Sequence, residues 1–143
     1  MKLSKGLSEK NRLARKIKEL QNRIEAHNSY IKGNTPVYKI KDLLTELDST
    51  IIELTELKTK IYRANKPVQE KIFRLAELKS FAAFLRKIKI KEGKILEERW
   101  NSEVREWESE LGTVDRDKLL EKTEKEIDSV QVELDRFNFE TEI

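Results

Sequence analysis

The sequence predicts an all-α fold of long antiparallel helices with coiled-coil-like packing. The chain of 143 residues holds only 4 Gly and 2 Pro and is rich in Glu, Lys, Leu and Arg, which is the composition of long helices. Its apolar residues recur at steps of three and four, the spacing of one helix face. An apolar share of 37% is too high for a disordered chain whose charged residues reach 40%. We therefore expect one helical domain, a helical bundle, over residues 1–143.

The first predicted element is a helical hairpin over residues 3–65. Its first helix runs from Leu3 to about Ile31, and Gly33-Asn34 forms the turn. Thr35 is then the expected N-cap of the second helix and Pro36 its first residue. The first apolar stripe comprises Leu13, Ile17, Leu20, Ile24 and Ile31; the second comprises Ile40, Leu44, Leu47, Ile51, Leu54 and Ile61, widened by Leu43 and Leu57.

The next predicted element is a core helix over residues 67–91. Pro67 disfavours the α region for Lys66, so we expect a break between helices at Asn65-Lys66-Pro67, with a sharp kink as the alternative. The stripe of this helix comprises Ile72, Leu75, Leu78, Ala82, Leu85 and Ile88, broadened by Phe81 and Phe84.

The remainder is a variable segment over residues 94–112 and an acidic C-terminal helix over residues 115–137. Apolar steps of four, four, three and four favour a helix in the variable segment, while a short hairpin excursion within residues 87–114 stays open. Asp115 is the expected N-cap of the last helix. If the tail after it is extended, Phe137, Phe139 and Ile143 point to one side, and we expect them to form an ordered contact.

Charge is sorted along the chain. Residues 1–41 hold 11 Lys and Arg against 3 acidic residues, whereas residues 96–143 hold 16 Asp and Glu against 7 basic ones. Such a chain can neutralise itself across packed helices, which weakens the usual inference from its basic pI of about 9.0 to nucleic acid. The acidic helix is expected to lie near basic surface of the first or third helix.

No residue pattern predicts catalysis, a cofactor or a metal site. His27 is the only histidine and there is no cysteine, so a packed histidine is favoured over a ligand. Glu53/Glu56, Glu103/Glu106 and Glu121/Glu124 place paired carboxylates at helical spacing. Solvated carboxylates paired with Lys or Arg are favoured over a Mg²⁺ site.

Two sets of residues are candidates for interaction. Trp100 and Trp107 lie a heptad apart, and we expect them to bury in the core or in a self-assembly contact, with a foreign partner as the alternative. The apolar tail is expected to enter a groove on this chain or on a second copy. Basic clusters could contact phosphates, although no aromatic residue interleaves with them as in single-strand binders. The tail candidates are Phe137, Phe139 and Ile143; the phosphate candidates are Lys5, Arg12, Lys16, Arg23, Arg86, Lys87, Lys89 and Lys91.

Several dispersed motifs stand out along the chain: Met1–Leu3, Leu13 with Leu20–Arg23, Leu43–Asp48, Ile61–Asn65, Thr113–Asp115 and Asp135–Ile143. Together they resemble the small bacterial helical family known as septicolysin. The resemblance spans most of the chain and implies a helical fold, but no particular activity. The chain departs from the family pattern after Asn65, where Lys66-Pro67 replaces a longer Thr- and Gly-containing connection.

We expect a non-enzymatic, self-assembling helical scaffold, with a homodimer as the favoured state. The alternative is an electrostatic binder of nucleic-acid backbones. A cytoplasmic location is expected, because cysteine is absent, the N-terminus lacks an apolar signal core and no apolar run is long enough for a membrane span. No small-molecule substrate is indicated.

Overall fold

The computed structural model describes residues 1–96 and 104–143, and its fold is all-α with one short β-hairpin. The chain forms two compact units, which are considered separately. Unit 1 comprises residues 1–68 and 135–143, and unit 2 comprises residues 69–134. The single domain expected from the sequence stays a prediction.

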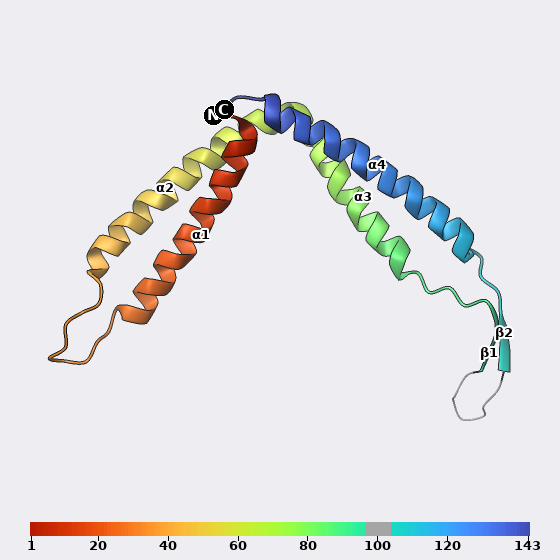
Figure 1. Cartoon of the computed structure of the whole chain (residues 1–143), viewed down its shortest axis with the longest axis horizontal. Helices are drawn as coiled ribbons and strands as arrows, with labels where there is room; N and C mark the ends of the chain where they lie inside the picture. The colour runs from red at the N-terminus through yellow and green to blue at the C-terminus, as the bar shows by residue number, and fades with distance from the viewer. Residues whose placement is uncertain (97–103) are drawn as a thin grey trace. The chain divides into compact units, whose positions relative to one another are not determined.

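Unit 1 is built on a helical hairpin of α1 (Leu3–His27) and α2 (Ile40–Asn65), which lie side by side (Figure 1). The predicted hairpin and its turn are confirmed, with Gly33 at a φ of 94° that favours glycine. The predicted ends are wrong, because α1 stops at His27 and α2 starts at Ile40. Thr35 and Pro36 therefore lie in the loop and cap nothing.

The buried face of α2 includes Leu54 and Ile61 of the predicted stripe but not Leu44 or Ile51. Thr50, Leu54, Leu57 and Ile61 are buried, whereas Leu44 and Ile51 are 48% and 43% exposed. If the predicted repeat through Leu44 and Ile51 faced the core, its next position, Lys58, would also be buried. Burying that charge would cost far more free energy than burying the Thr50 hydroxyl in the observed register. The Thr50 hydroxyl donates to the Glu46 carbonyl oxygen at 2.7 Å, so its burial leaves no unpaired donor.

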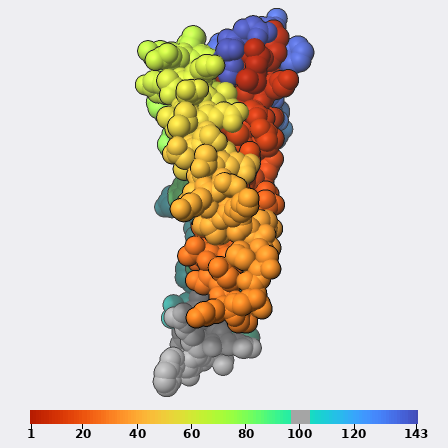
Figure 2. Space-filling view, turned by 90° about the vertical axis from the view of Figure 1, so that its left-hand side faces the viewer, coloured from red at the N-terminus to blue at the C-terminus, as the bar shows by residue number. Residues whose placement is uncertain are grey.

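The core of unit 1 joins the hairpin to the C-terminal tail. Its buried residues are Leu3, Leu13, Leu54, Leu57 and Ile61. Leu7, Ile17, Ala64, Phe137 and Ile143 pack against them. In Figure 2 the side chains of α1 and α2 meet along the length of the hairpin.

The 3₁₀ turn η1 (Lys66–Val68) separates α2 from α3 (Gln69–Lys87). The predicted break is thus confirmed, but Lys66 keeps helical angles (φ −48°, ψ −44°) despite preceding Pro67. The tighter 3₁₀ turn accommodates the proline at the end of a helix.

Unit 2 contains α3 and the part of α4 (Thr113–Glu140) up to Leu134. The predicted stripe of α3 is confirmed at Leu75, Leu78, Ala82 and Leu85, which are all buried. α4 begins at Thr113 rather than after an Asp115 cap, so Asp115 lies in its first turn, where the helix dipole favours a carboxylate.

Between α3 and α4 lies an antiparallel β-hairpin. Strand β1 (Gly93–Leu96) pairs with β2 (Val104–Trp107), and Gly93 lies opposite Trp107. The favoured helical interpretation of this segment is therefore wrong, and the hairpin alternative is confirmed over the described residues. Gly93 has a φ of 84° and begins β1, instead of ending an element. Trp100 and Glu103 lie outside the described residues.

Ion pairs join α3 to α4, as predicted for the acidic helix. Lys71 Nζ lies 2.7 Å from Glu133, and Arg74 Nη2 lies 2.9 Å from Glu126. Arg86 pairs with Glu124. The predicted docking of the acidic helix on basic surface of the third helix is confirmed within unit 2.

Candidate interaction site

The chain termini form an ordered contact in unit 1 (Figure 1). The backbone N–H of Leu3 donates to the backbone carbonyl oxygen of Thr141 at 2.8 Å. The backbone N–H of Ile143 donates to the carbonyl oxygen of Met1 at 2.9 Å. Glu142 accepts from Lys2 Nζ at 2.9 Å and from the Met1 ammonium at 3.0 Å. These two cations hold the pKa of Glu142 below its ordinary value.

The predicted tail is ordered, but its shape is different. α4 continues to Glu140, so Phe137 and Phe139 lie on opposite faces of a helix instead of on one side of an extended strand. Phe137 packs on the core, whereas Phe139 is 70% exposed. Ile143 packs against Gly6 and against the core of unit 1. Two of the three tail candidates are thus used within the chain.

Three of the predicted phosphate contacts line one hollow on α1. Arg12, Lys16 and Arg23 border a cavity of about 280 Å³ together with Arg15. Two of these cations already have partners, since Arg12 Nε donates to Glu9 at 2.9 Å and Lys16 Nζ lies 3.0 Å from Glu46. The Arg12 guanidinium lowers the pKa of Glu9, and Glu9 raises that of Arg12. The hollow is basic but partly neutralised.

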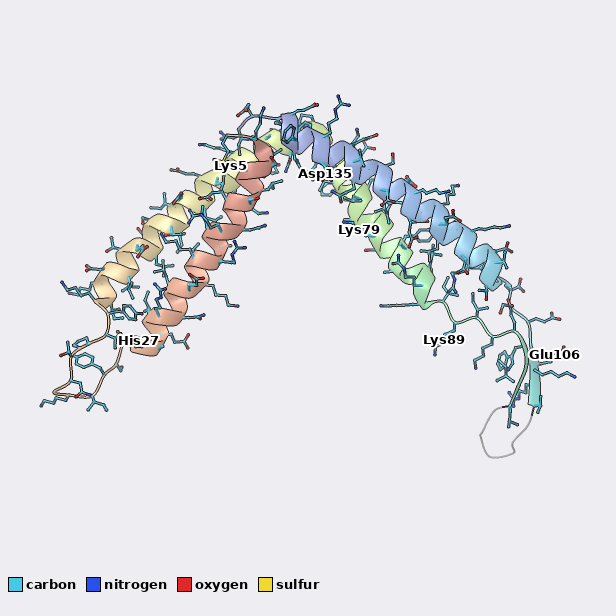
Figure 3. All side chains as sticks on the ribbon, viewed as in Figure 1. Lys5, His27, Lys79, Lys89, Glu106 and Asp135 are labelled. Atoms are coloured by element: carbon cyan, nitrogen blue, oxygen red, sulfur yellow. The ribbon has the colours of Figure 1, made fainter. Side chains whose placement is uncertain are left out.

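Lys5 lies apart from that hollow, near the start of α1, while His27 lies at its other end (Figure 3). Lys5 lines a second cavity of about 400 Å³ whose wall mixes Lys60 with Glu9, Glu53 and Glu56. Opposite charges balance there, so the cavity has no clear preference for an anion. The His27 ring meets the Tyr38 ring edge-on at 5.1 Å between centroids, which confirms the packed histidine.

The predicted basic cluster at the end of α3 is divided among different partners. Arg86 pairs with Glu124 on α4. Lys91 Nζ lies 4.6 Å from the Trp107 ring centroid, a cation–π contact. Lys89 lines a cavity of about 480 Å³ beside Trp107. Lys87 and Lys89 are both exposed, and neither forms an ion pair with another described residue.

The Trp107 indole marks the helix-proximal end of the hairpin. Its ring nitrogen is buried and has no hydrogen-bond partner among residues 1–96 and 104–143. The indole ring lies under Lys91 Nζ, and the residue as a whole is partly exposed. The heptad pairing with Trp100, a candidate outside the described residues, has no counterpart in the β-hairpin geometry of β2.

The sequence interpretation missed the outward face of α3. Phe73, Phe81 and Phe84 are 64%, 41% and 60% exposed. The Phe81 and Phe84 rings stack on each other with centroids 6.4 Å apart, so they do not broaden the core as predicted. The available signal was a second stripe on the same helix, at steps of three and four: Glu70, Phe73, Glu77, Ser80, Phe84 and Lys87.

The described residues contain neither a metal-binding cluster nor a helix that could span a membrane. No group of three or more His, Asp or Glu side chains in the described ranges is placed to hold a metal ion. Among the helices of the same residues, none is both long and apolar enough to cross a membrane.

The model of a family of unknown function (DUF6847) matches residues 10–143, so the chain belongs to this family. No curated protein and no solved structure matches it.

Proposed function

We propose that this member of the DUF6847 family is a non-enzymatic scaffold protein that assembles with copies of itself, as a dimer in the simplest case. The observation that carries the proposal is the row of exposed phenylalanines on α3. Three large aromatic side chains on one exposed helix face are unusual for a surface that meets only water. Aromatic residues are enriched in the buried centres of protein interfaces.

The distribution of charge supports a protein partner over nucleic acid. Arg74, Arg86 and Lys71 on α3 are each paired with an acidic residue of α4. These pairs leave the phenylalanines as the most distinctive feature of the helix surface. Leu44, Ile51 and Ile52 on α2 are also at least 43% exposed and offer further apolar area for assembly.

Solution mass tests the proposal directly. Light scattering across a concentration series from nanomolar to tens of micromolar should show a species of at least twice the 16.9 kDa of one chain. A sharp monomer mass over the whole series would contradict self-assembly.

A second candidate function is binding of a nucleic-acid backbone at the basic hollow of α1. It is supported by the convergence of Arg12, Arg15, Lys16 and Arg23 on one cavity. Neutralising phosphates releases counterions, so such binding weakens steeply with salt. A salt-titrated gel shift should then show binding that is lost in an Arg15→Glu/Arg23→Glu variant; binding equal to that of the unaltered chain would exclude the hollow.

A further inference from the structure

We infer that α3 packs antiparallel against α3 of a second copy. The two helices are related by a two-fold axis that crosses them at the level of residues 78 and 79 along the helix. The inference rests on the proposed self-assembly and specifies its surface, orientation and register. The helix α3 carries two lengthwise stripes of residues. One stripe holds the buried Leu75, Leu78, Ala82 and Leu85 of unit 2.

The second stripe lies on the outward face. Every one of its members is exposed, and its steps of three and four are those of a helix-pairing seam. Phe73 and Phe84 are its large apolar residues, with Phe81 alongside. Glu70 stands at one end of the stripe and Lys87 at the other.

This stripe is complementary to itself when reversed. About the stated axis, Phe73 faces Phe84 of the second copy and the small Ala76 faces its Phe81. Glu70 faces Lys87. The two-fold axis repeats each of these contacts once more, as in any isologous interface.

Charge selects this orientation over the parallel one. Neither Glu70 nor Lys87 forms an ion pair with another described residue, so both charges are open to a partner. A parallel pair in register would set Glu70 against Glu70, Glu77 against Glu77 and Lys87 against Lys87. Like charges placed opposite each other disfavour that pairing, whereas the antiparallel pair matches opposite charges.

Disulfide trapping distinguishes the two orientations. The chain has no cysteine, so Glu70→Cys, Lys87→Cys and the double variant each give clean thiols. Positions 70 and 87 are roughly 25 Å apart along one helix, too far for a disulfide within the chain. We expect the oxidised double variant to form a covalent dimer, and each single variant to stay uncrosslinked.

The outcomes separate this inference from the proposed function. Cross-linking of either single variant alone would indicate parallel helices and overturn the inference. No cross-link in a double variant whose mass is still oligomeric would also overturn it, while leaving self-assembly intact. A monomeric mass for the unaltered chain would remove both.

A matched pair of substitutions tests the surface itself. Phe84 and Phe139 are 60% and 70% exposed, so neither change to Ser empties a core. We expect Phe84→Ser to raise the dimer dissociation constant at least tenfold and Phe139→Ser to leave it unchanged, with equal helical circular dichroism in both. An unchanged constant for Phe84→Ser, or an equal rise for Phe139→Ser, would overturn the inference.

Discussion

Ile143 occupies the space that a side chain at Gly6 would need. A methyl group built on Gly6 would lie 2.5 Å from Cδ1 of Ile143 and 3.7 Å from Cδ1 of Leu57. Glycine inside a helix is less stable than alanine by about 0.5–1 kcal/mol. In this helix that loss accompanies a notch on α1 in which the C-terminal side chain packs.

We predict that Gly6→Ala and Ile143→Ala are energetically coupled. In the Ile143→Ala background, Gly6→Ala should stabilise the chain by about 0.5–1 kcal/mol, because the notch is then empty. In the unaltered chain the same change should give no gain or a loss, since the terminal side chain must move. Urea unfolding of the four proteins measures the coupling; additive effects would show that Ile143 does not use the notch.

We predict that the seam of α2 is sensitive at Leu54 and tolerant at Leu44. Leu54 is 9% exposed and Leu44 is 48% exposed. Leu54→Ala should lower the free energy of unfolding by about 2–5 kcal/mol, because it leaves a cavity. Leu44→Ala is the matched control and should change it by under about 1 kcal/mol. Equal losses measured by urea unfolding would place both residues in the seam.

The sequence predicted the long helices well because burial in them follows a simple period. The stripe of α3 was identified correctly, and so was the turn at Gly33. On α2 two registers share Leu47, Leu54 and Ile61. One adds Leu43, Thr50 and Leu57 and the other adds Leu44, Ile51 and Lys58, so each gains two apolar residues. The polar member decides between them, because burying the charge of Lys58 costs more than burying the Thr50 hydroxyl.

The other errors have two physical causes. The alternation at Lys87–Lys91 indicated a strand, but β1 lies further along the chain at Gly93–Leu96, and the apolar steps from Leu96 to Leu111 also fitted a helix. Cross-strand pairing of β1 with β2 prevailed over that local pattern. Phe81 and Phe84 were assigned to the core because hydrophobicity does not say which face of a helix has a neighbour.

We predict that the contact between the termini weakens in acid. The pKa of Glu142 in the folded chain lies below its ordinary value of 4.5, chiefly because Lys2 and then the Met1 ammonium bond its carboxylate. A depressed carboxyl pKa gives stability that is fully present above pH 4.5 and is lost as the pH falls through the folded value. The stability difference between the unaltered chain and Glu142→Gln should therefore be constant from pH 4.5 to neutral pH, where both cations stay charged, and vanish in stronger acid. A difference that stays constant down to pH 2 would contradict the ion pair.

We predict that the pairing of α3 with α4 tolerates exchange of its charges. Arg74 and Glu126 are both exposed and lie 2.9 Å apart, so the pair is worth no more than about 1 kcal/mol. Arg74→Glu alone should destabilise unit 2, because it sets two carboxylates together, and Glu126→Arg alone should do the same with two guanidinium groups. The double exchange should restore most of the loss.

Added salt of about 1 M reduces the Debye length to about 3 Å, so it should shrink the loss of stability in both single variants. Thermal melts at low and high salt measure this; a double variant as unstable as the two single losses combined would mean that the two side chains do not meet in solution.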